Sequence, residues 1–393
     1  MIEIPGDVKE IIDTLNRHGF EAFAVGGCVR DTLLGREPGD WDITTSAHPE
    51  QVKHIFKHTI DTGIAHGTVT VMKHHVGYEV TTYRIDGEYE DGRHPKSVTF
   101  TSSLKEDLRR RDFTINAMAY HHETGIIDEF GGMEDLRSGV IRCVGNPIDR
   151  FQEDALRILR AIRFCAQLGF SIEERTKEAI RSVAPNLAKV SKERIQMELT
   201  KLLLSGRPEN IKEVYELGIS AYISPWFHQA DRSHLQISPE LPKKRHIRWA
   251  AFLKDTPRED VLCILKDLKL DNDTIFGVRL LTQWVFQEIP AEKTGIRRVM
   301  SQMAPSYFDD LLTLKRHLGW QLADQVEALA EEIRRDGDCV SLKTLAVSGN
   351  DLLNAGVKPG KAVGEALQGL LDFVLEHPEG NQKDILLSRL AIF

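Results

Sequence analysis

The sequence predicts an α+β protein in which an N-terminal mixed sheet with helices is followed by an all-α remainder. Three observations support this prediction. Short apolar runs with strand-like alternation recur between helical segments through about residue 145. At Asn146-Pro147 a helix-capping residue and a proline begin a helix, and helical periodicity dominates from there onward. The 393 residues are also enough for two or more domains.

The first elements alternate between helix and strand. Asp7 can cap a helix that ends at Gly19. A strand over 21–25 then leads through Gly26-Gly27 into a helix over 29–34. The paired glycines let the backbone approach a ligand, and the free N–H groups of the helix start suit a phosphate.

Asp40 and Asp42 are expected on a second short strand. At positions i and i+2 both carboxylates leave the same face, while Trp41 points the other way. Two hard oxygen ligands side by side suit Mg²⁺. Each feature alone has an ordinary explanation, as a turn or a solvated strand end. Their order, a Gly-Gly turn followed at once by a two-carboxylate strand, indicates nucleotidyl chemistry.

The rest of the N-terminal part continues the mixed pattern. A helix is expected over 49–56, and two strands over 67–73 and 78–83 form a hairpin. The polar, glycine-rich stretch 86–96 predicts a mobile loop. The helix over 104–111 ends in three arginines, which commonly pair with the helix dipole. An Asp and an Asn follow shortly after them, which makes this cluster less ordinary.

The helix that begins at Asn146 is expected to run to about Gly169, with one apolar and one charged face. The charged face carries Glu153, Asp154, Arg157, Arg160 and Arg163. A solvated, salt-bridged face is the plain explanation. The functional alternative is base recognition, because Asp154 only accepts hydrogen bonds and Arg157 only donates them. Such a pair fits the amino group and ring nitrogen of C and A, and rejects U and G.

Composition and charge narrow the function classes. The chain has no apolar run long enough to cross a bilayer and no secretory signal, so we expect a cytoplasmic protein. Its five cysteines show no C-x-x-C spacing, which predicts reduced thiols without zinc or disulfides. The net charge of −8 predicts that any nucleic-acid contact is local. The basic clusters 243–249 and 315–317 are interpreted as solvated surface rather than RNA contacts.

Several ordered motifs resemble the bacterial class II CCA-adding enzymes, which are tRNA nucleotidyltransferases of the polymerase-β-like superfamily. The motifs cover about half of the chain, between Gly26 and Leu199. They are Gly26-Gly27-x-Val29-Arg30-Asp31 with Asp40-x-Asp42; Arg110-Arg111-Asp112-Phe113-Thr114-x-Asn116-Ala117; Arg150-Phe151-x-Glu153-Asp154-Ala155-Leu156-Arg157 with Leu159-Arg160-Ala161-x-Arg163-Phe164; and Glu193-Arg194 with Glu198-Leu199.

The resemblance implies a domain order and a reaction. It implies a catalytic nucleotidyltransferase head over 1–145, a helical neck for base recognition over 146–210, a helical body over 211–300, and a helical tail for tRNA binding over 301–393. The implied reaction adds C, C and A to the tRNA 3′ end from CTP and ATP. The 3′-hydroxyl attacks the α-phosphate, two Mg²⁺ ions assist, pyrophosphate leaves, and no nucleic-acid template is needed.

The resemblance also implies the site residues. Asp40 and Asp42 are implied to bind the catalytic magnesium, and Glu153 to support the base-selecting pair. Glu79 is a further candidate carboxylate near the metals, with an ordinary surface glutamate as the alternative. The implied nucleotide-binding residues are Gly27, Arg30, Arg111, Asp112, Asn116, Asp154, Arg157, Arg160 and Arg163.

One segment departs from the family pattern, and several alternatives stay open. The family usually has an aromatic residue and two arginines before the loop proline, whereas this loop reads Asp91-Gly92-Arg93-His94-Pro95. This difference concerns the efficiency of adding the final A. The alternatives are a partial enzyme that adds only CC or only A, a bacterial poly(A) polymerase, and a non-catalytic RNA-binding protein. Apolar stripes in the C-terminal helices are also compatible with a homodimer.

Overall fold

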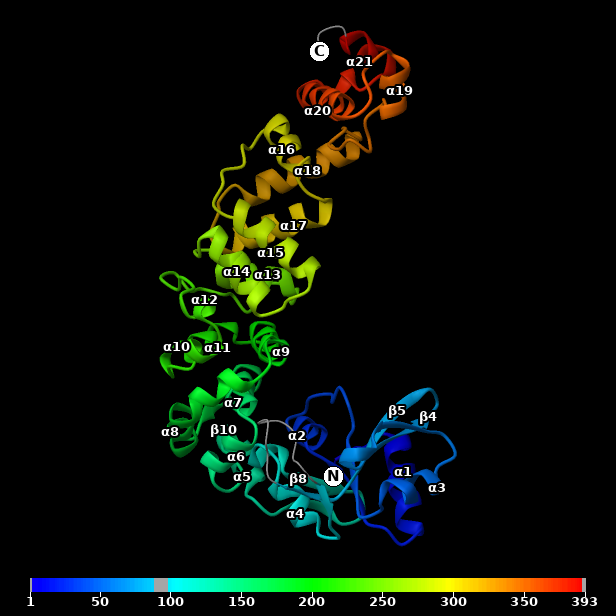
Figure 1. Cartoon of the computed structure of the whole chain (residues 1–393), viewed down its shortest axis with the longest axis vertical. Coiled ribbons are helices and arrows are strands. Elements are labelled where there is room, and N and C mark those ends of the chain that lie inside the picture. The colour runs from blue at the N-terminus through cyan, green and yellow to red at the C-terminus, as the bar shows by residue number, and fades with distance from the viewer. Residues whose placement is uncertain (1, 88–97, 391–393) are drawn as a thin grey trace. The chain divides into compact units, whose positions relative to one another are not determined.

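The computed structural model of the chain describes residues 2–87 and 98–390 (Figure 1). The chain divides into two compact units. Unit 1 comprises Met1–Ala230 and Cys263–Leu270, and unit 2 comprises Asp231–Leu262 and Asp271–Phe393. The predicted boundaries at residues 145, 210 and 300 are finer than this division and stay predictions. Within the described residues, no helix combines the length and apolarity needed to span a membrane.

A seven-stranded mixed sheet forms the N-terminal part of unit 1, in the order β3-β4-β5-β2-β1-β8-β9. Strand β2 runs parallel to β5, and the other neighbouring pairs are antiparallel. The predicted mixed sheet, and with it the α+β fold class, is confirmed. The strands are β1 (Ala22–Val25), β2 (Ile43–Thr45), β3 (Thr59–Gly63), β4 (Thr68–Lys73), β5 (Val76–Thr82), β8 (Met118–His121) and β9 (Gly125–Asp128).

Helices and two small sheets accompany the large sheet. The helices are α1 (Gly6–Arg17), α2 (Gly27–Leu33), α3 (Pro49–Ile55), α4 (Leu104–Arg109) and α5 (Gly132–Ser138). The small sheets pair β6 (Arg84–Asp86) with β7 (Val98–Phe100), and β10 (Val140–Ile141) with β11 (Ser171–Ile172). The loop predicted over 86–96 falls, from residue 88 onward, outside the described residues.

Two predicted details in this part are wrong. Helix α1 starts after Pro5, so Asp7 lies in its first turn rather than at the cap. The hairpin between β4 and β5 turns over two residues rather than four, at His74 and His75. Both histidines have left-handed φ values, of 47° and 67°. Two such residues in succession match the twist of a tight hairpin, which lets β5 begin at Val76.

The single helix predicted from Asn146 to Gly169 is two helices, α6 (Pro147–Glu153) and α7 (Leu156–Leu168). The predicted ends are confirmed: the Asn146 side chain caps the Ile148 N–H, and Gly169 ends α7 with a φ of 78°. The apolar face packs as expected, since Ile158, Leu159 and Ile162 are buried. Unit 1 continues with α8 (Glu174–Val183), α9 (Lys192–Leu203), α10 (Lys212–Glu216), α11 (Ser220–Ile223) and α12 (Pro225–His228).

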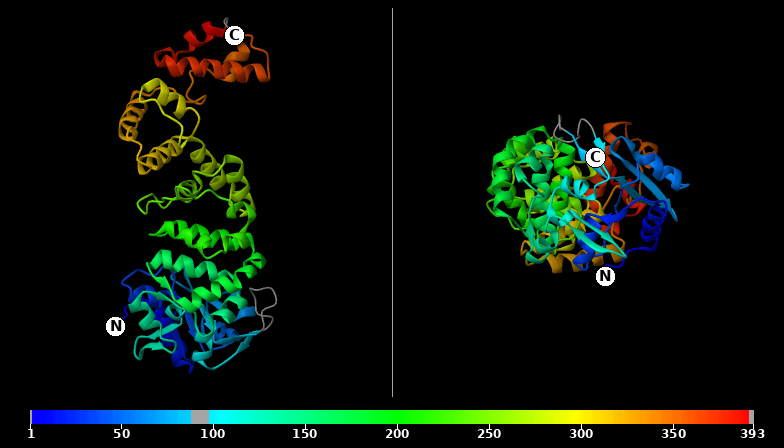
Figure 2. Two further views of the ribbon diagram at one scale, coloured as in Figure 1. Left: turned by 90° about the vertical axis from the view of Figure 1, so that its left-hand side faces the viewer. Right: turned by 90° about the horizontal axis from the view of Figure 1, so that it is seen from below.

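The remaining chain is helical, as Figure 2 also shows for its yellow and red parts. Two residues of its basic clusters are buried rather than solvated. Arg248 donates to the carbonyl oxygens of four loop residues, and Lys315 to those of Val285 and Gln287. The helices are α13 (Arg245–Leu253), α14 (Arg258–Asp267), α15 (Asn272–Trp284), α16 (Lys293–Met300), α17 (Pro305–His317), α18 (Ala323–Asp336), α19 (Gly349–Asn354), α20 (Lys361–Glu376) and α21 (Lys383–Arg389).

Candidate functional site

A polar cavity of about 480 Å³ lies within unit 1, lined by residues of helices α2, α7 and α9 and of the segments that connect the sheet to them. Its size is in the range of small-molecule sites. The cavity brings together every predicted nucleotide-binding residue and Asp42. Residues that the sequence analysis did not assign to the site also line it: Gly26, Arg110, Leu156, Phe164 and Arg194.

Gly26 rather than Gly27 is the glycine that this site requires. Its φ is +84°, and a Cβ at this position would lie 3.1 Å from Nη1 of Arg111. A side chain would therefore strain the backbone and crowd the arginine. Gly27 is the first residue of α2, where a Cβ would meet only an ordinary contact with Arg30. Within the described residues Arg111 Nε is buried without a hydrogen-bond partner, which suits a ligand oxygen.

Asp40 and Asp42 precede strand β2 instead of lying on it, which corrects the prediction. Aspartate and glycine disfavour strands, so the regular ladder begins only at Ile43. The carbonyl of Asp42 still accepts a hydrogen bond from the Val25 N–H at 3.0 Å, which fixes its backbone beside β1. Both carboxylates line a second cavity, of about 490 Å³, together with Glu79 on β5. Asp42 lines both cavities.

The carboxylates of the second cavity influence one another. Burial raises the pKa of Asp42, the charge of Asp40 raises it further, and Arg111 opposes both effects. Burial also raises the pKa of Glu79, followed by the charges of Asp42 and Asp40. Such crowding of negative charge suits a bound cation. Among the described residues no three His, Cys, Asp or Glu side chains are grouped to hold a metal, so the candidate ligands are the aspartate pair.

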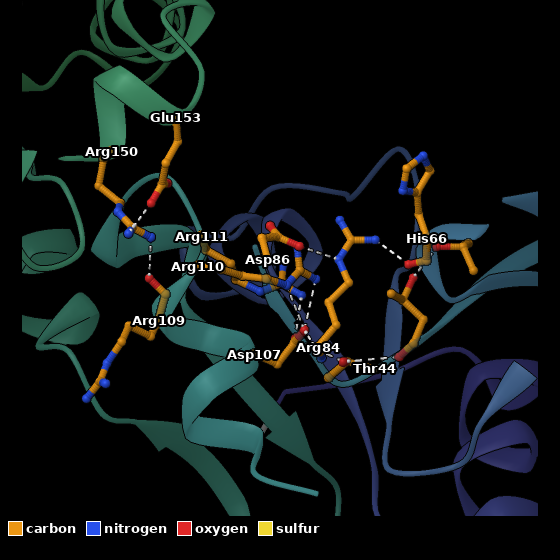
Figure 3. Close-up of polar contacts among 12 residues, drawn as sticks. Thr44, His66, Arg84, Asp86, Asp107, Arg109, Arg110, Arg111, Arg150 and Glu153 are labelled. Atoms are coloured by element: carbon orange, nitrogen blue, oxygen red, sulfur yellow. Dashed lines mark hydrogen bonds and ion pairs between the residues drawn. The ribbon is translucent and has the colours of Figure 1, made fainter. Parts of the chain in front are cut away.

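A buried carboxylate, Asp107 on α4, organises the arginines next to these aspartates (Figure 3). It accepts from Nη2 of Arg110 at 2.8 Å, from Nη2 of Arg111 at 3.3 Å, and from Oγ1 of Thr44 at 3.0 Å. Burial alone would raise its pKa, but the two arginines and these hydrogen bonds hold the pKa of Asp107 below its usual value. Its i, i+3 and i+4 spacing to the arginines was visible in the sequence.

Asp154 lies in the break between α6 and α7, which corrects its predicted place on the charged helix face. Its φ and ψ are −145° and 101°. Oδ1 accepts the N–H of Leu156 at 3.0 Å, and Oδ2 accepts Nη2 of Arg194 at 2.8 Å. An aspartate that caps the next helix in this way competes with continuation of the preceding one. Arg194, on α9, is a site residue that the sequence analysis missed.

The guanidinium of Arg157 bonds groups of Glu153 and Arg110, while its backbone N–H bonds the carbonyl of Asp154. Its Nη1 lies 2.7 Å from Oε2 of Glu153, and its Nη2 donates to the carbonyl of Arg110 at 3.1 Å. Glu153 also pairs with Arg150, which donates to the carbonyl of Arg109 (Figure 3). The structure therefore fixes the acceptor and the donor of the predicted base-selecting pair separately.

Asp112 and Asn116 hold arginines of the cavity. Asp112 accepts from Nη2 of Arg160 at 2.7 Å and from Nδ2 of Asn116 at 3.0 Å. Asn116 Oδ1 in turn accepts from Nη1 of Arg30 at 2.5 Å. Burial alone would raise the pKa of Asp112, but Arg160 and these hydrogen bonds hold it well below the usual range. Arg163 forms a separate buried pair with Glu198, at 2.5 Å.

Family models match three parts of the chain. The Poly A polymerase head domain matches residues 22–142, an RNA and SrmB-binding region of polymerase A matches 169–231, and domain 2 of tRNA nucleotidyltransferases matches 242–390. Together these matches span most of the chain.

Curated relatives match along nearly the full length. The CCA-adding enzyme of Limosilactobacillus reuteri (strain DSM 20016) is 37% identical over 97% of this chain and 95% of its own. The CCA-adding enzyme of Enterococcus faecalis is 38% identical, covering 98% and 96%. That of Lacticaseibacillus paracasei is 41% identical, covering 91% and 88%.

Solved structures agree with these relatives. The Bacillus stearothermophilus CCA-adding enzyme in complex with CTP superposes with a TM-score of 0.85 at 35% identity, covering 98% of this chain and 96% of that one. The Thermotoga maritima CCA-adding enzyme complexed with tRNA has a TM-score of 0.65 at 22% identity, covering 99% and 96%. The second match supports the fold alone.

Proposed function

The chain belongs to the family of CCA-adding enzymes, and we propose from this premise that it adds C, C and A to the 3′ end of tRNA from CTP and ATP. One observation carries the proposal beyond family membership. Asp42 lines two cavities, one rich in arginines and one with paired carboxylates. Cations that suit phosphates thus stand beside carboxylates that suit a metal, which is the combination that nucleotidyl transfer needs.

Asp40 and Asp42 fit a divalent metal, which we propose to be Mg²⁺. Their oxygens are hard ligands, and their mutual repulsion would be relieved by a cation. When bound, the metal lowers the pKa of the attacking 3′-hydroxyl and neutralises charge on the leaving pyrophosphate. In the transfer step the hydroxyl would lose its proton to solvent and its oxygen would bond to the α-phosphorus. The bond from that phosphorus to the oxygen bridging to the β-phosphate would break, and pyrophosphate would leave with that oxygen.

The arginines would bind the triphosphate and Asp154 with Arg157 would select the base. Arg30, Arg111, Arg160 and Arg163 supply donors for phosphate oxygens. Asp154 would accept from the exocyclic amino group of C or A. A carboxylate has about four lone-pair sites, so its bonds to Leu156 and Arg194 leave room for this contact. U and G present a carbonyl there and would leave a buried charge unsatisfied.

Asp112, Asn116, Gly27 and Glu153 complete the proposed nucleotide site. Asp112 and Asn116 match a motif that is associated with ribose recognition in the family. This role is compatible with their hold on Arg160 and Arg30, because both side chains line the same cavity. Glu153 would support base selection through its bond to Arg157. The cytoplasmic location and the homodimer stay predictions.

Incorporation assays would test the function. Purified protein with Mg²⁺ is given tRNA that lacks its 3′ end, with CTP alone, ATP alone or both, and products are measured to one nucleotide. We expect CC with CTP alone and CCA with both. Asp42→Asn should abolish both products, whereas Asp61→Asn, which removes an exposed carboxylate on β3, should not.

The other results would identify the alternatives. CC as the final product would identify a CC-adding enzyme, and A added only to tRNA ending in CC would identify an A-adding enzyme. Long A-tails without CTP incorporation would identify a poly(A) polymerase, the function that the head-domain match also allows. No incorporation, with tRNA binding intact, would leave the RNA-binding alternative. Removing metal with EDTA should stop addition, and restoring Mg²⁺ should recover it.

A further inference from the structure

The aromatic ring of Phe164 lies among three arginines of the polar cavity. Its centroid is 4.0 Å from the guanidinium carbon of Arg163, 4.9 Å from that of Arg30, and 5.4 Å from that of Arg160. All three distances are within the range of cation–π attraction. Arg160 and Arg163 come from the same helix as Phe164, whereas Arg30 comes from α2.

Each of these arginines is anchored on another side by a carboxylate. Arg30 pairs with Asp31 at 2.9 Å, Arg160 with Asp112 at 2.7 Å, and Arg163 with Glu198 at 2.5 Å. The carboxylates come from different elements, and Asn116 links Arg30 to Asp112 as well. The ring is the group that the three arginines share.

The ring itself is held firmly. Phe164 is 4% exposed, and it packs edge-to-face against Phe113, with ring centroids 5.8 Å apart and an interplanar angle of 84°. Phe113 is fully buried in the head. An aromatic face carries partial negative charge, so it attracts guanidinium groups while it keeps water out of the space between them. An aliphatic side chain would fill the volume but supply no such attraction.

We propose that Phe164 is a positioning residue that sets the spacing of Arg30, Arg160 and Arg163 for the triphosphate of the incoming nucleotide. This inference rests on the proposed function, since it assigns the arginines to the triphosphate. CTP and ATP carry the same triphosphate. A ring with less negative charge on its face should therefore weaken the binding of CTP and of ATP by the same factor. The rejection of U and G, which we assign to Asp154 and Arg157, should stay unchanged.

Fluorination of the ring tests the proposal, because fluorine withdraws charge from the ring face with little change of shape. Phe164 is replaced by monofluoro-, difluoro- and pentafluorophenylalanine, and binding of inorganic tripolyphosphate is measured by calorimetry. We expect affinity to fall stepwise, by about tenfold for the pentafluoro ring. KM for CTP and ATP should rise by the same factor, with an unchanged melting temperature. The same series at Phe151, a fully buried ring on α6, is the control.

Conventional variants add a second readout. Phe164→Tyr keeps the ring and should keep the affinity, whereas Phe164→Leu should lose it. Equal tripolyphosphate affinity across the fluorinated series would overturn the proposal, as would an equal loss in the Phe151 series. Failure of the proposed function is seen separately, as the absence of C and A addition by the unmodified protein. A fluorine-dependent loss of tripolyphosphate binding would support the positioning role even then.

Discussion

Arg194 on α9 forms an ion pair with Asp154, which lies between α6 and α7. Nη2 of the arginine is 2.8 Å from Oδ2 of the aspartate. Asp154 lies between two helices, and its backbone is bonded to both: its N–H donates to the carbonyl of Arg150, and its carbonyl accepts the N–H of Arg157. One carboxylate oxygen accepts the backbone N–H of Leu156, and the other accepts Nη2 of Arg194. The direction in which Asp154 presents its remaining acceptor capacity therefore depends on a helix 40 residues away.

Substitution Arg194→Gln should reduce the selectivity for C and A. The glutamine cannot make the same two-pronged contact, so Asp154 gains freedom to turn away from the base. We expect the free-energy difference between correct and wrong bases to fall by about 1.4 kcal/mol. This loss corresponds to a tenfold rise in UTP and GTP incorporation relative to CTP. Single-turnover incorporation of each nucleotide measures the ratio. Arg175→Gln, at an exposed position on α8, is the matched control. An unchanged ratio would assign Arg194 a purely structural role.

The predicted base-selecting pair shows which features of the site could be predicted from the sequence alone. The chemistry of Asp154 and Arg157 followed from their hydrogen-bonding groups, and both residues line the cavity. The non-helical backbone conformation of Asp154 could not be predicted, because the helical periodicity of the sequence continues across the break. Arg194 was quoted within a motif but had no assigned partner. A contact over 40 residues depends on how α9 packs, and no local pattern encodes it.

The same limit applies elsewhere in unit 1. Periodicity located β1, β4 and β5 to within a few residues, whereas β3, β8 and β9 of the same sheet were not predicted. Pairing of β2 with β5 in parallel depends on chain crossovers that have no local signal. Conversely, Asp107 was predictable in part, because its spacing to Arg110 and Arg111 places the three side chains on one helix side. The complete burial of Asp107 and its hydrogen bond to Thr44 are visible only in the structure, because they depend on how distant segments pack.

Asp107→Asn should destabilise unit 1 and weaken nucleotide binding together. The substitution removes a buried negative charge between two arginines, and we expect a loss of about 3 kcal/mol in the free energy of unfolding. Without Asp107 the guanidinium of Arg111 is no longer held in one position, so it should bind phosphate less well. KM should therefore rise for CTP and ATP alike. Urea unfolding and steady-state kinetics measure the two effects. Glu106→Gln, on the same helix but paired with the exposed Arg109, should change neither.

Glu79→Gln should increase the metal concentration needed for half-maximal addition, by about tenfold. Glu79 lines the same cavity as Asp40 and Asp42, and their charges raise its pKa after burial does. We therefore propose that it helps to orient the metal through water or the aspartates. Titration of activity with Mg²⁺ and Mn²⁺ gives the shift. Glu50→Gln removes an exposed carboxylate on α3 and serves as the comparison. If both variants need the same metal concentration, Glu79 is an ordinary surface glutamate.

The Asp112–Arg160 pair should make the stability of unit 1 sensitive to acid. Burial opposes the charge of Asp112, but Arg160 and Asn116 outweigh it, so the pKa of Asp112 is lower in the folded protein than in the unfolded chain. A carboxyl group with a lowered folded pKa stabilises the fold above its unfolded pKa of about 3.9. That contribution is lost as the pH falls from this value towards the folded pKa.

The variant Asp112→Asn separates this contribution from general acid unfolding. At pH 7 it should be less stable than the unmodified protein by about 2 kcal/mol, because a charged hydrogen-bonded pair is replaced by a neutral one. Below about pH 4 the difference should narrow, because Asp112 then takes up a proton in the unfolded chain while it stays charged in the folded protein, which favours unfolding of the unmodified protein. Urea unfolding at a series of pH values between 7 and 3 measures the gap. Asp61→Asn, whose pair with Lys53 is exposed, should show a small gap at every pH. A constant gap for Asp112→Asn would mean that packing, rather than charge, accounts for its stabilising effect.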